Sequence, residues 1–282
     1  TLPASSAASD VYKRQQLPLI RAVNIPTYGG SNMARSTCFL LVILLACASL
    51  SGCLFSSEDT GQINLQFDYD TQFGTIIETY SEGELVSINP VVVSFEFKNT
   101  TSRNPLQTFG VNANDGREPI TIDAKIDTFL QVDFTNHGMY NLDIYAVDSH
   151  GNVFNQSLVV RIDLRIDWTE TDTNAPLSLP FNPEPENQGQ HPKMIEIISN
   201  VENPPIIDSI GDSGQSVQLT WQLVDELDDI CQTRNGQIND GDTMMWQTLY
   251  FNTYMLHELR IVMEEGQDLV NVNQSVAILY DN

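Results

Sequence analysis

Hydrophobic and polar residues alternate along much of the chain with a period of two. Ile63, Leu65 and Phe67 alternate with polar neighbours, and the same period returns in residues 91–97 and 120–134. This period predicts β-strands with one buried face, because successive side chains of a strand point to opposite faces of the sheet. Turn-forming residues separate the runs, at Asn89-Pro90, Asn104-Pro105, Asn114-Asp115-Gly116 and His137-Gly138. No run has helical spacing, so the pattern predicts an all-β fold of the β-sandwich type.

The clearest strand signal lies in residues 138–152. Tyr140, Leu142, Ile144 and Ala146 alternate with polar residues and are followed by the turn residues Asp148-Ser149-His150-Gly151-Asn152. This segment resembles the closing hairpin of PKD-type and related prokaryotic immunoglobulin-like domains, in which a Gly-x-Tyr-x-Leu-x-Ile-x-Ala-x-Asp strand enters an Asp-x-x-Gly-Asn turn. The resemblance implies an immunoglobulin-like β-sandwich. It implies no particular function, because many functions share this architecture.

The second half of the chain looks like a copy of the first. Residues 155–163 align with 273–281, and 142–146 align with 259–263 at nearly the same offset. Similar pieces in the same order predict two tandem immunoglobulin-like antiparallel β-sandwiches. We expect the first over 62–168 and the second over 194–282. In this alignment Trp221 becomes a core anchor of the second sandwich.

Between the two predicted domains lies a segment rich in proline, residues 169–193. It holds Pro176, Pro180, Pro183, Pro185 and Pro192. Such a composition favours an extended, semi-rigid linker. The alternative is an ordered loop or edge strand that packs on either domain through Leu177, Leu179 and Phe181.

The start of the chain carries a predicted export signal. Met33-Ala34-Arg35 supplies a positive charge, and residues 39–50 form an apolar run that is too short to span a membrane. Leu50-Ser51-Gly52-Cys53 resembles the lipobox of prokaryotic lipoproteins, which implies cleavage before Cys53 and a lipid on its sulfur. The alternatives are an ordinary signal peptide with a chance cysteine, or a buried hydrophobic helix.

These features divide the N-terminal part into three segments. Residues 33–52 form the predicted lipoprotein signal peptide, and 53–61 form a short polar tether. Residues 7–15 resemble translated sequencing-adapter sequence, so we expect 1–32 to be non-native upstream sequence. A genuine upstream coding extension is the alternative for that segment.

Composition excludes several classes of protein. With 41% hydrophobic and 9% aromatic residues, the chain is too apolar for intrinsic disorder. Its 37 acidic and 13 basic residues give a net charge of −24, which repels nucleic acid. Of the four cysteines, Cys38 and Cys47 leave with the signal and Cys53 is lipidated. Cys231 then stands alone, so no internal disulfide is expected, and it is either a small buried residue or a reactive thiol.

The motifs of common enzymes are missing, so we expect no catalytic activity. The four histidines show no metal-hydrolase spacing, and no Gly-x-Ser-x-Gly turn or phosphate-binding glycine loop occurs. No cofactor is expected apart from a structural Ca²⁺, for which Asn239, Asp240 and Asp242 are the candidate ligands. The turn at 148–152 is a weaker candidate, and the favoured interpretation of both loops is a plain solvated turn. Three sequons are candidate glycosylation acceptors in an organism with the machinery: Asn99, Asn155 and Asn273.

Together these features predict an exported protein, anchored by lipid at the surface of the cell membrane or outer membrane. We expect it to bind, adhere or display a binding face, with a glycan or a surface protein as ligand and with no nucleic acid partner. Loops at the sandwich ends would carry recognition, because the strands are needed for packing. Two alternatives stay open: an accessory, non-catalytic segment of a larger secreted hydrolase, and a purely structural envelope lipoprotein.

Overall fold

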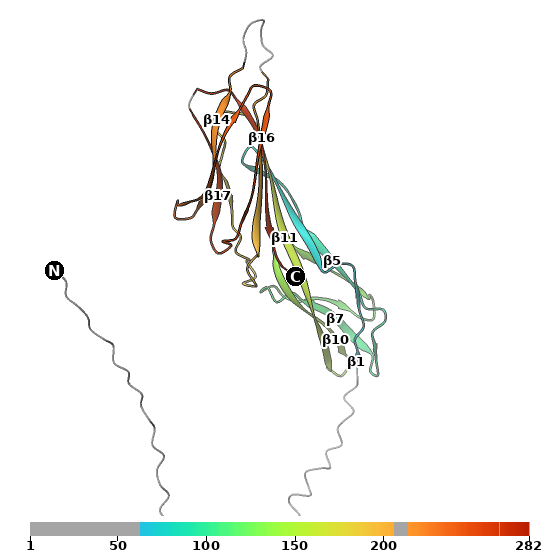
Figure 1. Cartoon of the computed structure of the whole chain (residues 1–282). Coiled ribbons are helices and arrows are strands. Elements are labelled where there is room, and N and C mark those ends of the chain that lie inside the picture. Colours follow the sequence, from blue (N-terminus) through green and yellow to red (C-terminus); the bar gives the residue numbers. More distant parts are fainter. Residues whose placement is uncertain (1–62, 206–213, 265, 282) are drawn as a thin grey trace, which may run out of the picture. The chain divides into compact units, whose positions relative to one another are not determined.

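The computed structural model describes residues 63–205, 214–264 and 266–281, and every regular element in them is a β-strand (Figure 1). The predicted all-β class is confirmed. The described residues belong to one compact unit, Asp59–Asn282. The predicted upstream segment, signal peptide, lipidated Cys53 and tether lie outside the described residues. In the part of the chain that is described, no helix is long and apolar enough to cross a membrane.

The first sandwich has a small sheet that faces one part of a large sheet. The small sheet has the order β2-β5-β9, and the large sheet contributes β8, β7, β10 and the first half of β11. The bounds are β1 Ile63–Asn64, β2 Asp68–Tyr69, β5 Val91–Glu96, β6 Thr101–Ser102, β7 Leu106–Asn112, β8 Ile120–Asp123, β9 Phe129–Phe134 and β10 Gly138–Asp148; β1 pairs with β6. Aromatic rings fill the space between the sheets. Phe97 stacks on Phe109 with ring centroids 4.6 Å apart, and Phe134 meets Tyr140 edge to face at 4.7 Å.

One long strand, β11, joins the two halves of the molecule. It runs from Val153 to Thr173, 21 residues. Its first part pairs with β10, and its second part pairs with β18 (Val270–Leu279). The same second part also pairs in parallel with β3 (Phe73–Ser81), which forms a hairpin with β4 (Glu84–Asn89). Both sandwiches therefore share one nine-stranded sheet.

The second sandwich sets a four-stranded sheet against the far part of the large sheet. The four-stranded sheet has the order β12-β17-β14-β15, and the large sheet contributes β16, β13, β18 and β11. The bounds are β12 Leu179–Phe181, β13 Met194–Glu202, β14 Val217–Asp225, β15 Ile230–Ile238, β16 Thr243–Tyr250 and β17 His257–Met263. Trp221 on β14 is fully buried, and its Nε1–H donates to Ser199 Oγ on β13 over 2.9 Å. Trp221 is thus a core residue that ties the two layers together, as its sequence context predicts.

The predicted repeat fails at its second hairpin. Because 142–146 and 155–163 pair in the hairpin of β10 and β11, the alignment predicts the same pairing for residues 259–263 and 273–281. Instead β17 pairs with β12 and β14, while β18 lies in the other sheet between β11 and β13. The two segments face each other across the core instead of lying side by side. The sequence similarity thus reflects a shared strand pattern, and it does not predict strand pairing.

The structure also differs from the predicted linker over residues 169–193. Thr169 to Thr173 complete β11, and Leu179 to Phe181 form β12, which pairs with β17. Leu179 and Phe181 are buried in the core. The apolar side chains between the prolines explain the difference, because their burial stabilises the segment against the second sandwich.

Candidate ligand-binding site

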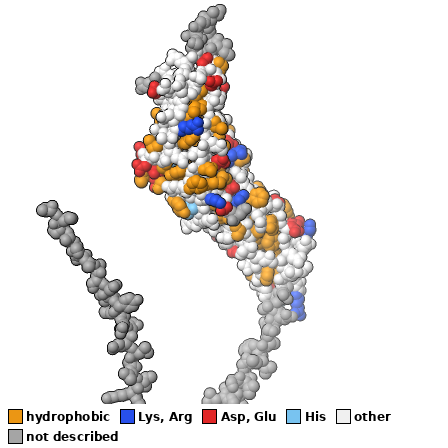
Figure 2. Space-filling model, viewed as in Figure 1, with side chains coloured by type: hydrophobic (Ala, Val, Ile, Leu, Met, Phe, Trp, Pro, Cys, Tyr) orange, Lys and Arg blue, Asp and Glu red, His pale blue; other side chains and the backbone are white. Residues whose placement is uncertain are grey.

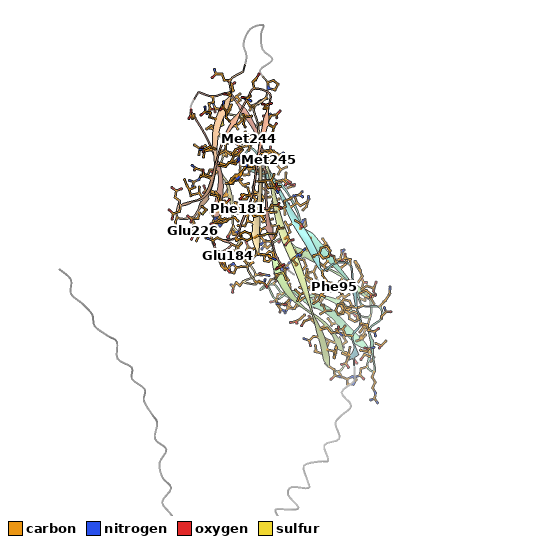
Figure 3. The ribbon with its side chains drawn as sticks, viewed as in Figure 1. Phe95, Phe181, Glu184, Glu226, Met244 and Met245 are labelled. Atoms are coloured by element: carbon orange, nitrogen blue, oxygen red, sulfur yellow. The ribbon has the colours of Figure 1, made fainter. Side chains whose placement is uncertain are left out.

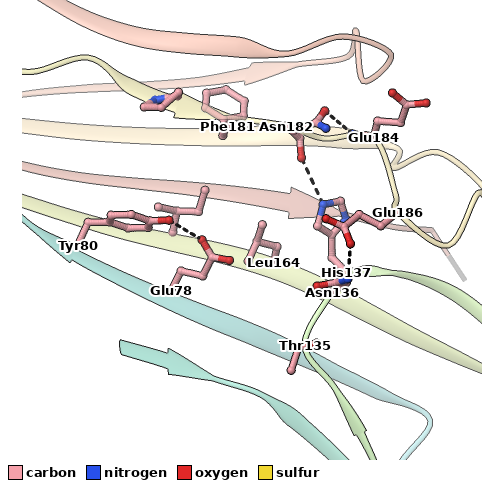
Figure 4. A pocket seen from close by; sticks show the side chains of 12 residues that line it. Glu78, Tyr80, Thr135, Asn136, His137, Leu164, Phe181, Asn182, Glu184 and Glu186 are labelled. Atoms are coloured by element: carbon pink, nitrogen blue, oxygen red, sulfur yellow. Dashed lines mark hydrogen bonds between the residues drawn. The ribbon is translucent and has the colours of Figure 1, made fainter. Parts of the chain in front are cut away.

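A cavity of about 230 Å³ opens where the four-stranded sheet ends (Figure 4). β12 is an edge strand of that sheet, and the inner face of β3 is only partly covered. Ile76 of β3 is fully buried, whereas Glu78 and Tyr80 on the same face are half-buried and line the cavity. The other lining residues are Thr135, Asn136, His137, Leu164, Ile166, Pro180, Phe181, Asn182, Glu184 and Glu186.

The acidic wall of the cavity comes from the extended segment after β12. Residues 181–186 alternate between buried and exposed positions: Phe181, Pro183 and Pro185 face inward, and Asn182, Glu184 and Glu186 face outward. Proline fixes its own backbone angle and disfavours helix in the preceding residue, so the Pro-Glu-Pro-Glu sequence holds this extended form. Figure 3 shows Phe181 and Glu184 on the same side of the molecule.

A side-chain clamp fixes the end of this segment. The Asn187 Nδ2–H donates to the backbone oxygen of Met139 at the start of β10, over 3.0 Å. The Asn187 Oδ1 in turn accepts the Gly189 N–H over 3.0 Å. Both ends of the acidic segment are therefore attached to strands, at β12 and at β10, so that its carboxylates are held near the cavity.

The cavity is strongly electronegative. Glu78, Glu184 and Glu186 contribute three carboxylates, and no Lys or Arg occurs among the described residues that line it. Tyr80 O–H donates to Glu78 Oε2 over 3.2 Å, and Asn136 Nδ2–H donates to Glu186 Oε2. Burial, together with the neighbouring Glu78 carboxylate, raises the pKa of Tyr80, so the phenol stays a donor at neutral pH. Figure 2 shows both acidic side chains and scattered Lys and Arg side chains on one face of the molecule.

A buried histidine forms one corner of the cavity. His137 has its Nε2 3.3 Å from the backbone oxygen of Asn182 and its Nδ1 2.8 Å from Tyr280 Oη. A carbonyl oxygen only accepts, so Nε2 carries the hydrogen and Nδ1 accepts the Tyr280 hydroxyl. Burial lowers the pKa of His137 below 6.5, which favours this neutral form. Through these two hydrogen bonds, His137 links the acidic segment, the start of β10 and the end of β18.

A second, smaller hollow of about 120 Å³ adjoins the first. The two share Thr135, Asn136 and Glu186. Here Arg117 pairs with Asp115 over 2.6 Å, so its charge is largely neutralised. The two hollows together form a continuous polar surface that offers carboxylates, amides and hydroxyls to a ligand.

The predicted Ca²⁺ ligands lie elsewhere, in the turn between β15 and β16. Asn239, Asp240 and Asp242 are all exposed there. Asn239 Nδ2–H donates to Asp242 Oδ2 over 3.1 Å, and Asp242 N–H donates to the Asn239 oxygen over 3.0 Å. Within residues 63–205, 214–264 and 266–281, no three His, Cys, Asp or Glu side chains gather so that they could hold a metal ion. Ca²⁺ binding at this turn stays a prediction.

The turn at 148–152 is accounted for by hydrogen bonds alone. Asp148 accepts N–H groups from the backbone of His150 and Asn152 and from the side chains of Asn104 and Asn152. Burial raises the pKa of Asp148, but these donors, with Asn152 and Asn104 foremost, outweigh it and hold the pKa below its ordinary value. The carboxylate thus caps a turn.

The remaining predicted residues lie apart from the cavity. Asn99, Asn155 and Asn273 are exposed, in a turn, on β11 and on β18 respectively. Cys231 is a free, half-buried thiol on β15.

From the sequence, Glu78, Glu184 and Glu186 were not predicted as site residues. The alternation of proline and glutamate at 183–186 was the available signal, because it marks an extended segment with one acidic face.

Comparison with known proteins identifies no family. No protein-family model and no curated protein matches the chain. Among solved structures it is similar to a carbohydrate-binding module of the β-sandwich superfamily, at 9% identity and TM-score 0.30, over 79% of this chain and 100% of that one. It is also similar to fibronectin(III)-like modules of Clostridium thermocellum CbhA, at 12% and 0.24, over 77% and 94%. A third is the Bacteroides ovatus protein SGBP-B of a mixed-linkage glucan utilization locus, in complex with a heptasaccharide, at 9% and 0.16, over 72% and 53%. With TM-scores this low, none of these likenesses carries an argument about this chain.

Proposed function

We propose that this chain is a non-catalytic binding protein, held at the cell surface by a lipid on Cys53, and that it binds a glycan in the cavity beside β3. The observation that carries the proposal is the cavity itself. It combines three carboxylates with the amides of Asn136 and Asn182, and none of its described lining residues is Lys or Arg.

These groups suit the chemistry of sugar hydroxyls. A carboxylate accepts hydrogen bonds from hydroxyl groups, and hydrogen bonds to charged groups contribute about 1.5–3 kcal/mol each. Side-chain amides both donate and accept, which matches the dual character of a hydroxyl. Leu164 and Phe181 add an apolar floor for the C–H face of a sugar ring.

The size of the cavity limits how much of a glycan it holds. Its 230 Å³ lies below the roughly 300–1,000 Å³ of pockets that enclose drug-sized ligands. One sugar residue or a chain end fits this volume, and the adjoining hollow extends the contact along the chain. An anionic glycan is disfavoured by the carboxylates.

The test is a titration of the whole chain, carrying Cys53→Ser to keep it in solution, against a panel of neutral and acidic oligosaccharides by calorimetry. Glu184→Ala should weaken binding about 10-fold or more, because a charged hydrogen-bond partner is lost. Glu226→Ala is the matched control, because Glu226 is an exposed acid that does not line the cavity. Absence of binding across the panel, or an equal loss from Glu226→Ala, would refute the cavity as the site.

A further inference from the structure

We propose a second glycan site on the outer face of the large sheet, specific for a neutral, extended chain that lies across the strands. A hollow of about 280 Å³ lies on this face, over β11, β18, β13 and β16. Its polar residues include Thr169, Asn200, Glu202, Thr243, Asn271 and Asn273. The site is separate from the cavity and shares no lining residue with it.

Strand register arranges these residues in two rows. Thr169 pairs with Asn273, Asn273 with Asn200, and Asn200 with Met245, so one row crosses four strands. The next row runs from Asn271 to Glu202 and on to Thr243. Residues directly opposite each other on neighbouring strands point to the same face.

The two rows differ in how their side chains are engaged. In the second row Asn271 Nδ2–H donates to Glu202 Oε2 over 3.0 Å, and its Oδ1 accepts the Asp172 N–H over 3.1 Å. In the first row, by contrast, no described residue hydrogen-bonds the side-chain amides of Asn200 and Asn273. The second row is therefore held in place, and the first row has two amides available for a ligand.

The chemistry of the rows selects the ligand. The amides and hydroxyls of the rows are uncharged and both donate and accept, as sugar hydroxyls do, and the one carboxylate in the rows, Glu202, accepts hydrogen bonds from hydroxyls. Neighbouring strands lie about 4.7–4.9 Å apart, close to the advance of one residue along an extended β-linked glycan. One sugar then faces each strand, with the exposed Met245 against a C–H face at the end of the row (Figure 3).

Other polymers fit this surface less well. A peptide that adds to a sheet pairs with a free strand edge, whereas β18 and β13 are each paired on both sides. A nucleic acid is repelled by the net charge of −24. Asn273, the acceptor of one predicted sequon, lines this hollow. A covalent glycan on Asn273 would therefore occupy the site and block a free ligand.

The experiment titrates the whole ¹⁵N-labelled chain, carrying Cys53→Ser, with cellohexaose, an extended β-linked glucan. We expect the side-chain amide signals of Asn200 and Asn273 to shift. Asn200→Ala and Asn273→Ala should each weaken binding about 2- to 10-fold, the size expected from one neutral hydrogen bond. Asn155→Ala is the matched control, an exposed asparagine on β11 outside the hollow, and should leave the affinity unchanged.

Two results would overturn the proposal. One is that millimolar cellohexaose leaves both amide signals unshifted in the folded protein. The other is that maltohexaose, whose α-linked chain curls, binds the same amides equally well. Glu184→Ala separates the two sites, because it removes a contact of the cavity and leaves the outer-face shifts in place.

Discussion

Tyr280→Phe tests the junction of the two sandwiches. Tyr280 is 5% exposed and donates its hydroxyl to Nδ1 of His137, which is 8% exposed. The backbone N–H of Tyr280 also donates to Asp163 Oδ1 over 3.0 Å. Asp163 lies on β11 at the point where the antiparallel partner of β11 changes from β10 to β18. The substitution removes one oxygen and leaves a buried ring nitrogen without its donor.

The cost follows from the loss of one partner in a buried hydrogen bond. An unsatisfied buried polar group costs about 1–3 kcal/mol. For a chain of this size each kcal/mol lowers Tm by roughly 2–4 °C, so Tm should fall by about 2–12 °C. The assay is thermal and urea unfolding of the purified chain carrying Cys53→Ser, at pH 7.

Tyr145→Phe is the matched control. Tyr145 is half-buried on β10, and among the described residues none hydrogen-bonds its hydroxyl. Removal of that hydroxyl should change stability by no more than about 0.5 kcal/mol. If Tyr280→Phe costs no more than Tyr145→Phe, the account of the junction is refuted.

Three further predictions concern the core, the buried histidines and the anchor. Ser199→Ala should lower the free energy of unfolding by about 1–3 kcal/mol, measured in urea, because Trp221 Nε1–H loses its acceptor; an unchanged midpoint contradicts this. Burial lowers the pKa values of His137 and His257, so NMR titration should place both below 6.5. Their stability contribution is then present above pH 6.5 and is lost as the pH falls below it, whereas titration at or above 6.5 would contradict the assignment. Cys53→Ser should move the protein from the membrane fraction to the soluble fraction of its host, and retention on the membrane would exclude a lipid at Cys53.

Local patterns in the sequence predict the strands well. Tyr140, Leu142, Ile144 and Ala146 alternate, and all four are buried on β10. The same alternation continues through Leu164, Ile166 and Trp168, yet the proline-rich composition of residues 169–193 predicts a linker and hence a domain boundary at residue 168. β11 continues to Thr173 because its second half pairs with β18 and β3.

The cavity could not be predicted in the same way. Glu78 and Glu184 lie far apart in the sequence and meet only because β3 pairs with β11 and β12 pairs with β17. A period of two says which face a residue takes, but it does not say which strand lies beside it. The predicted hairpin of β17 and β18 is wrong for the same reason. Strands with similar alternating patterns can pair in either of the two sheets, so the pattern alone does not predict their neighbours.

The most direct test of the central claim uses a reporter beneath the cavity. Tyr80 lines the cavity and stacks on Trp168 with ring centroids 5.5 Å apart, and Trp168 Nε1–H donates to Glu170 Oε1 over 2.8 Å. The chain has three tryptophans, and Trp221 and Trp246 lie together in the second core, 6.3 Å apart. When a glycan binds in the cavity, the account predicts that the indole N–H signal of Trp168 shifts and the other two stay in place. Saturable binding that Glu184→Ala weakens but that leaves the Trp168 signal unmoved would contradict it.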